Sequence, residues 1–213
     1  MNILLAAVQH EVGRVVAVAS ADVYGRVAAD QLPIDEGCPL RPHSPYGASK
    51  AAADVISLQT FLAHGLGVIR ARPFNHLGPG QSDRFVASAL ASRIARNEVD
   101  GGDEVPIGDL TPRRDFTDVR DVVRAYRLLV QHGEPGEAYN ICSGRDVAVQ
   151  DIADQLVALA DRPMTLVPDP ELLRPVDTPV LRDLAHRCDR HDRELVDNVH
   201  ARVRALLDER SGA

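Results

Sequence analysis

Short apolar runs rich in β-branched residues alternate along the chain with longer segments of helical periodicity. The short runs predict strands at residues 14–20, 67–74, 105–109 and 137–142. The longer segments predict helices at residues 1–12, 45–64, 84–97, 117–131 and 149–160. Strands that alternate with helices in this way predict an α/β layered fold with a mostly parallel sheet.

Signals at the ends of the helices support these predictions. Ser44 is a candidate N-cap, Pro45 suits the first helical position, and Gly65 is a candidate stop for the helix between them. Gly13 is the expected stop of the first helix. Near the C-terminus, the Pro-broken stretch at 171–179 predicts a loop, and the apolar spacing within residues 192–210 predicts a surface helix.

Composition limits the classes of protein to consider. A chain of 213 residues that is 45% hydrophobic suits one domain, or one domain with a small lobe. Its 31 acidic and 24 basic residues are scattered and give a net charge of -7, which argues against a nucleic-acid partner. Membrane insertion is also not expected, since no apolar run approaches the roughly 20 residues that a span requires. We expect a cytoplasmic protein.

Three cysteines, Cys38, Cys142 and Cys188, lie far apart and in neither CxxC nor zinc-ligand spacing. Such spacing predicts neither a disulfide framework nor a structural metal. A reducing compartment fits this use of cysteine.

The stretch HSPYGASKAAAD at residues 43–54 contains the only lysine of the chain, Lys50, four residues after Tyr46. With four tyrosines in the chain, chance alone would give this spacing about 2 times in 100. On a helix the two side chains leave the same face. An ammonium beside a phenol favours the phenolate, so this pair is a candidate acid/base unit. The alternative is an exposed lysine and a half-buried tyrosine on an ordinary helix.

A second candidate lies where the first predicted strand ends. Ser20 falls at the C-terminal end of that strand, where ligands bind in open α/β sheets, and Asp22 follows in the turn. A serine hydroxyl can donate to a carbonyl or alkoxide oxygen, and a carboxylate can move a proton at a neighbouring carbon. Alone, Ser20 would be better explained as a turn former.

Six segments in the same order resemble one family: VASADVYG, PIDEGCPLRPHSPYGASK, VIRARPFNHLGPGQ, RRDFTDVRD, EAYNICSG and LRPVDTPVL. Across about residues 1–181 the chain is similar to the extended short-chain dehydrogenases/reductases, in their sugar-nucleotide branch. Within that branch, RPFNHLGPGQ and LRPVDTPVL look most like GDP-4-keto-6-deoxy-mannose reductases and GDP-mannose 4,6-dehydratases.

The resemblance implies roles for the residues near the reacting atoms. It makes Tyr46 the catalytic acid/base, Lys50 its partner and a ligand of the nicotinamide ribose, and Ser20 the hydroxyl that orients the sugar C4 oxygen. Pro73 lies where the family chain passes the nicotinamide. Asp22 stands where dehydratases carry a glutamate, and its shorter side chain favours reduction over dehydration.

Four further positions match substrate contacts of the family. Asn75 matches a contact to the sugar or its diphosphate, Arg114 and Arg174 match arginines that pair with the pyrophosphate, and Asp177 matches an acidic position that faces the nucleoside. A planar guanidinium suits a diphosphate because it can donate two parallel hydrogen bonds. Each arginine alone would be better explained as a solvated ion-pair partner.

One family feature is missing from the printed sequence. No Gly-rich GxxGxxG turn follows a strand: Gly65 and Gly67 precede one, and Gly78 and Gly80 lie in a later loop. We therefore expect a chain truncated at its N-terminus: a partial Rossmann-like parallel sheet without its first strands and with an open edge, plus a small C-terminal substrate lobe. Residues 1–80 would be the rest of the nucleotide-binding domain. Residues 81–213 would form the lobe, with 137–160 returning to the sheet.

The resemblance implies an NAD(P)-dependent sugar-nucleotide oxidoreductase acting at hexose C4, with a GDP-sugar as substrate. It also implies a possible homodimer through helix 44–64. A dehydratase or epimerase, and a truncated remnant that does not bind the cofactor, are the alternatives. The choice between NAD and NADP and the identity of the sugar stay open.

Overall fold

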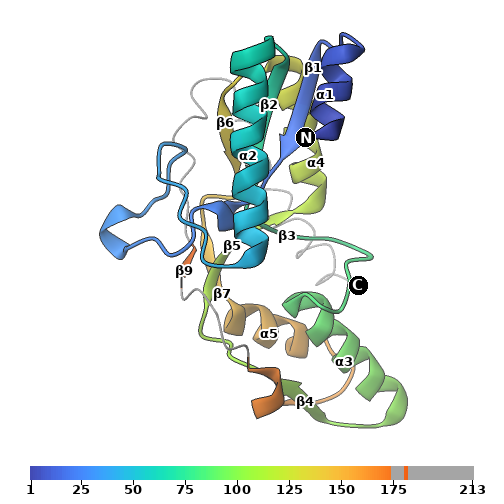
Figure 1. The fold of residues 1–213 in the computed structure, drawn as a ribbon. Coiled ribbons are helices and arrows are strands. Elements are labelled where there is room, and N and C mark those ends of the chain that lie inside the picture. The colour runs from blue at the N-terminus through green and yellow to red at the C-terminus, as the bar shows by residue number, and fades with distance from the viewer. Residues whose placement is uncertain (174–179, 182–213) are drawn as a thin grey trace. The chain divides into compact units, whose positions relative to one another are not determined.

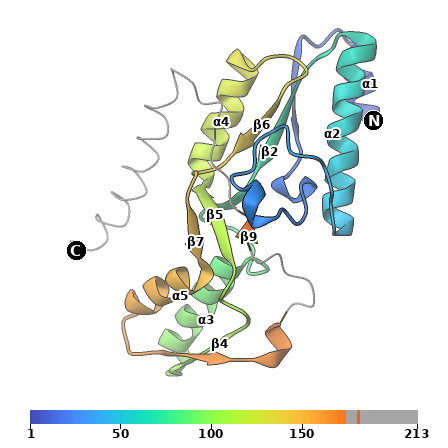
Figure 2. The same cartoon turned by 90° about the vertical axis from the view of Figure 1, so that its left-hand side faces the viewer.

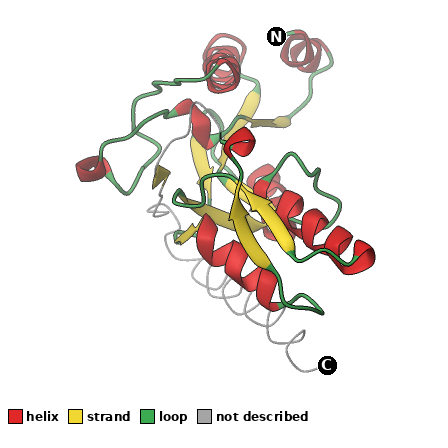
Figure 3. Cartoon of the chain, turned by 90° about the horizontal axis from the view of Figure 1, so that it is seen from below, coloured by secondary structure: helices red, strands yellow, loops and turns green. Residues whose placement is uncertain are grey.

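The computed structural model describes residues 1–173 and 180–181, which fold into two compact units. Unit 1 contains residues 1–76 and 115–145. Unit 2 contains residues 77–114 and 146–173 together with 180–181. Figure 1 and Figure 3 show that both units combine helices with strands.

A parallel three-stranded sheet forms the centre of unit 1. Its order is β1 (Arg14–Val18), β2 (Gly67–Pro73) and β6 (Ala138–Ile141). The central strand β2 is covered on both faces, and its residues Val68, Ile69 and Ala71 are fully buried. Among the described strands, only β2 pairs with β1, which leaves the outer edge of β1 open.

Helices cover both faces of this sheet (Figure 1, Figure 2). On one face, helix α1 (Asn2–Gln9) and helix α2 (Pro45–His64) contribute Leu4, Ala7 and Ile56 to a cluster with Val15 and Ala17 of β1. On the other face, helix α4 (Val119–His132) packs Val122 and its neighbours against Val16, Ala71 and Ile141. Alternate residues of β1 thus point to opposite faces, as the period of a strand requires.

The ends of α2 confirm the predicted signals. The Ser44 hydroxyl accepts a hydrogen bond from the Gly47 amide at 3.0 Å, Pro45 is the first helical residue, and Gly65 ends the helix with a φ of 69°. The prediction for the first helix was wrong at its C-terminal end. That helix stops at Gln9, and the left-handed residue after it is Glu11, with a φ of 50°, so Gly13 does not end it.

Unit 2 packs two helices with a pair of parallel strands (Figure 1). Helix α3 (Val86–Asp100) contacts helix α5 (Val149–Ala158), and strand β4 (Glu104–Ile107) pairs with strand β8 (Thr165–Pro168).

A further sheet has the order β3 (Asn75–Leu77), β5 (Arg113–Asp118) and β7 (Asp146–Ala148), and β9 (Val180–Leu181) pairs with β5. The remaining elements are three short 3-10 helices: η1 (Ala21–Val23), η2 (Ala29–Gln31) and η3 (Pro170–Leu172).

The α/β fold with a parallel sheet is confirmed, and the differences lie in short elements. Strands β3, β5, β7, β8 and β9 were not predicted, and β1 ends at Val18 rather than at Ser20. The predicted helix at 117–131 begins only at Val119, because Thr117 and Asp118 still belong to β5. The predicted helix at 192–210 lies outside the described residues. No helix in the described part of the chain has the length and apolar character needed to cross a membrane.

Candidate functional site at the carboxyl end of strand β1

The carboxyl end of β1 leads into a tight turn, which we call the serine turn (residues 20–25). Ser20 has extended backbone and caps η1, and its hydroxyl oxygen accepts a hydrogen bond from the Asp22 amide at 3.2 Å. The amides of Val23, Tyr24 and Gly25 donate to the carbonyls three residues earlier and close the turn. Because the Ser20 oxygen is the acceptor in its contact with Asp22, that contact leaves the hydroxyl hydrogen available to a ligand.

Lys50 joins helix α2 to this end of the strand. Its ammonium donates a hydrogen bond to the carbonyl oxygen of Val18, the last residue of β1, at 3.1 Å. The same nitrogen lies 5.8 Å from the centre of the Tyr46 ring, and Tyr46 is 53% exposed. An ammonium has three N–H donors, so the Val18 contact uses one of them. The predicted Tyr46 and Lys50 pair therefore lies beside the strand end that carries Ser20.

Gly47 allows the helix to approach the serine turn closely. A Cβ atom at this position would lie 2.7 Å from the carbonyl oxygen of Asp22 and 3.2 Å from the Ser44 hydroxyl. The first distance is shorter than a carbon and an oxygen tolerate without a shift of the backbone. The absence of a side chain next to Tyr46 is therefore what brings the acid/base helix and the serine turn into contact.

Pro73 lies at the same edge of the sheet as Ser20. The last paired residues of β1 and β2 are Val18 and Ala71, and Ser20 and Pro73 each follow two residues later along their parallel strands. Pro73 is buried, whereas Asn75, which begins β3, is exposed. The sheet thus brings Ser20 and Pro73 to one edge beside α2.

Arg114 belongs to unit 2, on the part of β5 that pairs with β9. It is half-buried, and its guanidinium donates to the carbonyl of Arg113 at 2.8 Å. Arg174 and Asp177, the other two predicted substrate contacts, lie outside the described residues. No group of three His, Cys, Asp or Glu side chains suited to a metal ion occurs within the described ranges.

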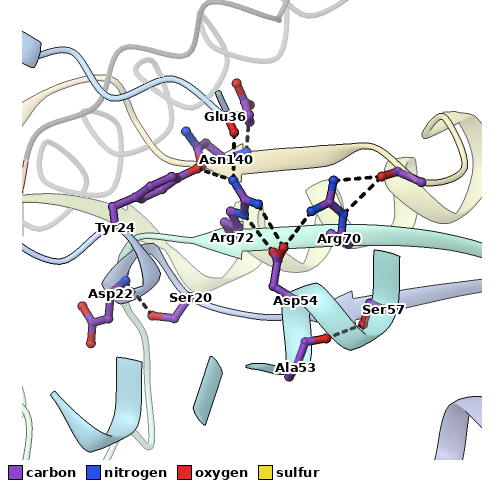
Figure 4. A network of polar contacts seen from close by, with 11 residues as sticks. Ser20, Asp22, Tyr24, Glu36, Ala53, Asp54, Ser57, Arg70, Arg72 and Asn140 are labelled. Carbon is purple, nitrogen blue, oxygen red and sulfur yellow. Dashed lines mark hydrogen bonds and ion pairs between the residues drawn. The ribbon is translucent and has the colours of Figure 1, made fainter. Parts of the chain in front are cut away.

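A buried polar network lies behind the site (Figure 4). Asp54, on the same helix as Tyr46 and Lys50, accepts hydrogen bonds from Arg72 at 2.8 and 3.0 Å and from Arg70 at 2.7 Å. Asp54 and Arg72 are only 1% and 3% exposed. Arg70 also donates to the carbonyl oxygen of Gly136 through two nitrogens. One carboxylate therefore pairs with two guanidiniums between helix α2 and strand β2.

The network continues from Arg72 to the serine turn. Another nitrogen of Arg72 donates to the Tyr24 hydroxyl at 2.9 Å and to the Glu36 carbonyl at 3.0 Å. The Tyr24 hydroxyl in turn donates to the side-chain oxygen of Asn140 at 2.6 Å. The backbone amide of Asn140 donates to the Glu36 carboxylate at 2.9 Å. Tyr24 is 1% exposed.

Burial and charge act against each other in this network. Burial by itself raises the pKa of Asp54, but the hydrogen bonds and charges of Arg72 and Arg70 outweigh it and hold the pKa below its ordinary value of 3.8. For Arg72, burial would lower the pKa, but Asp54 and Tyr24 outweigh it and raise the pKa. Both groups are therefore ionised at neutral pH. On helix α4, burial raises the pKa of Tyr126, and its electrostatic interaction with Tyr46 adds to this shift.

Sequence reasoning missed Gly47, Tyr24, Asp54 and Arg72 as parts of the site. A signal for one of them was present: Arg70 and Arg72 occupy alternate positions of a strand that is otherwise apolar. Alternate residues of a strand share a face, and two buried guanidiniums require an anion from the element that covers that face.

The fold and site together define a class: a parallel α/β nucleotide-binding fold with a serine at a strand end and a Tyr-x-x-x-Lys helix beside it. Comparison with known families then gives the assignment. The model of the NAD dependent epimerase/dehydratase family matches residues 1–142, and the chain belongs to this family. The predicted resemblance is thereby confirmed.

Among curated proteins, the chain is 42% identical over 158 residues to a GDP-6-deoxy-D-mannose reductase of Pseudomonas aeruginosa. The aligned region covers 74% of this chain and 52% of the relative. It is 34% identical over 156 residues to a dTDP-glucose 4,6-dehydratase of Streptomyces niveus, which covers 73% of this chain and 44% of that protein. The chain thus spans about half the length of the curated relatives it matches.

Solved structures of the family agree with this fold and carry nicotinamide cofactors. RMD from Pseudomonas aeruginosa, complexed with NADPH, matches with a TM-score of 0.78 and 36% identity, over 92% of this chain and 64% of that one. DesIV, a dTDP-glucose 4,6-dehydratase from Streptomyces venezuelae with NAD and TYD bound, matches with a TM-score of 0.74 and 27% identity, over 94% and 61%.

Proposed function

We propose that this chain carries the acid/base and substrate part of an NAD(P)-dependent sugar-nucleotide reductase that acts at C4 of the hexose. The observation that carries the proposal is the convergence of Tyr46, Lys50 and Ser20 at the carboxyl end of β1. The 42% identity to a GDP-6-deoxy-D-mannose reductase supports a GDP-sugar as the substrate.

Each of the three side chains has a task in the reduction of a ketone. Tyr46 donates a proton to the C4 oxygen, and its exposure lets a ligand reach the phenol. Lys50 stabilises the phenolate that remains, from a position fixed by its bond to Val18. Ser20 donates a hydrogen bond that orients the C4 oxygen and stabilises charge on it. When bound, NAD(P)H supplies the hydride.

Asp22 favours a reductase over a dehydratase. A dehydratase must also remove the proton at C5, and Asp22 offers a shorter side chain than the glutamate of dehydratases. Its backbone is held on both sides, because its amide donates to Ser20 and its carbonyl packs against Gly47. A backbone fixed in this way cannot move forward to compensate for the missing methylene group.

The residues present fit one part of the cofactor. Tyr46 and Lys50 on α2 and Pro73 on β2 lie at the carboxyl ends of the strands. These residues would hold the nicotinamide ribose and ring. The Gly-rich turn that holds a pyrophosphate does not occur in the 213 residues. We infer that a polypeptide segment outside this sequence holds the pyrophosphate, and that it pairs with the open edge of β1.

Substrate contacts complete the proposal. Asn75, Arg114 and Arg174 would contact the sugar diphosphate, and Asp177 would face the nucleoside; Arg174 and Asp177 lie outside the described residues. Val55 and Leu62 lie on helix α2, seven residues apart, and are 55% and 72% exposed. Because residues seven apart share a helix face, this apolar strip supports the proposal of a homodimer through α2.

The decisive experiment supplies the missing segment in trans. NADPH, NADH and a GDP-4-keto sugar are titrated into the purified chain, first alone and then with the N-terminal cofactor half of the Pseudomonas aeruginosa reductase. We expect saturable cofactor binding and turnover only in the mixture. The second candidate is a protein that binds the sugar nucleotide without catalysis. Substrate binding without turnover in the mixture would establish that alternative and refute the reductase.

A further inference from the structure

We propose that Asp54, Arg72 and Tyr24 are positioning residues, which fix the serine turn against the helix that carries Tyr46 and Lys50. The catalytic consequence rests on the proposed function, because it assumes that these side chains act on one substrate. The mechanical link itself is independent of any reaction. It joins two elements that each supply a reacting group and that lie 20 or more residues apart in the sequence.

One end of the link is on helix α2. Asp54 follows Lys50 by four residues and Tyr46 by eight, which places it about 6 Å and about 12 Å farther along the helix axis. Its two carboxylate oxygens accept from two nitrogens of Arg72, at 2.8 and 3.0 Å. A bidentate pair of this kind fixes both the distance and the rotation of the guanidinium.

The other end of the link is in the serine turn. The third nitrogen of Arg72 donates to the hydroxyl of Tyr24 at 2.9 Å, and its guanidinium carbon lies 5.3 Å from the centre of the Tyr24 ring. Tyr24 caps η1 at its C-terminal end, as Ser20 caps it at the N-terminal end. Any displacement of Tyr24 is therefore passed on to Ser20 through a single turn of backbone.

A contribution to folding stability alone does not explain why this link is built from buried charged and polar side chains. A buried ion pair contributes little net free energy compared with apolar residues of the same volume, because both charges lose their hydration. What a directional network supplies is a single geometry. Helix α2 also contacts the serine turn and the strand before it nearer the site: Lys50 donates to the Val18 carbonyl, and Gly47 packs against the Asp22 carbonyl. A small shift of the serine turn would therefore change both contacts.

The test uses amide hydrogen exchange and one isotopic label on the chain without cofactor or substrate. Since Lys50 is the only lysine, 13C-labelled lysine gives a single side-chain signal that reports on its contact with Val18. Tyr24→Phe removes the hydroxyl that joins Arg72 to the turn and keeps the ring. Tyr139→Phe is the matched control, because it removes a hydroxyl bonded to the Glu134 amide at 2.9 Å, outside the link.

We expect the amides of Val23, Tyr24 and Gly25 to exchange about tenfold faster in Tyr24→Phe, and the Lys50 signal to shift. Arg72→Lys, which keeps the charge but cannot span Asp54 and Tyr24 together, should give the same pattern. Tyr139→Phe should change neither readout once denaturant has matched the global stability of the variants.

Unchanged exchange in both link variants would overturn the proposal. So would an equal acceleration in Tyr139→Phe, because it would show a general loss of stability. Since no reaction is measured, failure of the reductase assay leaves this result intact, and failure here leaves the reductase proposal intact.

Discussion

Replacement of Asp54 by asparagine should destabilise unit 1 strongly. The side chain keeps its size and one carbonyl oxygen, but Arg72 and Arg70 lose the anion that both contact within 3.0 Å. Arg72 is 3% exposed and cannot regain water. Removal of one partner of a buried ion pair costs about 3–5 kcal/mol, and the remaining oxygen still accepts one hydrogen bond. We therefore expect the free energy of unfolding to fall by about 3 kcal/mol.

Urea denaturation followed by circular dichroism measures this loss. With an m-value of about 3 kcal/mol/M, the midpoint should fall by about 1 M at an unchanged slope. Asp121→Asn is the matched control, because Asp121 is also buried but lies 3.8 Å from the nitrogen of Arg124. A pair at that distance contributes about 1 kcal/mol or less.

The pH dependence separates charge from packing. Because the folded state holds the pKa of Asp54 below 3.8, the carboxylate contributes stability that is fully present above that pH. The contribution is lost as the pH falls from 3.8 through the lower pKa of the folded state. Asp54→Asn lacks this titration, so the difference in stability between the two proteins should shrink across that window. A difference below 1 kcal/mol at neutral pH, or one that is constant with pH, would refute the electrostatic role of Asp54.

Three further variants test the site. In the protein completed by a cofactor half, Tyr46→Phe should lower turnover by about a hundredfold or more with GDP-sugar binding unchanged, and an unchanged turnover refutes its role as the acid. Gly47→Ala should lower the free energy of unfolding, measured by thermal denaturation, by about 1–3 kcal/mol, because the added Cβ would lie 2.7 Å from the Asp22 carbonyl oxygen. Gly13→Ala is the control and should leave stability unchanged, because its Cβ would meet nothing within 4 Å. Arg114→Ala should weaken GDP-sugar binding by about tenfold in calorimetry, and equal affinity in Arg114→Ala and the neighbouring Arg113→Ala would contradict a specific diphosphate contact.

The parts of the fold that sequence predicts well are those specified by local chemistry. Helix α2 was predicted with both ends correct, because Ser44, Pro45 and Gly65 each act on backbone groups within four residues. Strands β1 and β2 were also found, since both contain short apolar runs rich in β-branched residues.

The short strands were missed because their order comes from distant partners. Strand β5, with the sequence RRDFTD, contains four charged residues, and its pairing with β9 joins Arg113 to Val180 across more than 60 positions. No local pattern specifies such a pairing, since strand propensity depends on the neighbours a strand meets.

The site shows the same division between local and distant order. The placement of Tyr46 and Lys50 on one helix face could be predicted because one helix turn sets their spacing, and that of Ser20 because a short apolar strand ends just before it. The residues that hold these groups in place were not predicted, since the link from Asp54 to Tyr24 joins three segments of the chain through one guanidinium.

That difference has a physical origin in what each kind of residue must satisfy. A reacting side chain needs only the right functional group facing the ligand, and its spacing along one element is visible in the sequence. A positioning side chain must satisfy a buried hydrogen-bonding group on another element, so its identity follows from contacts that exist only after folding. Arg72 shows this most clearly, because three of its partners, Asp54, Tyr24 and Glu36, lie 18, 48 and 36 residues away. Charged residues at alternate positions of an apolar strand are therefore the sequence feature that best indicates such a support.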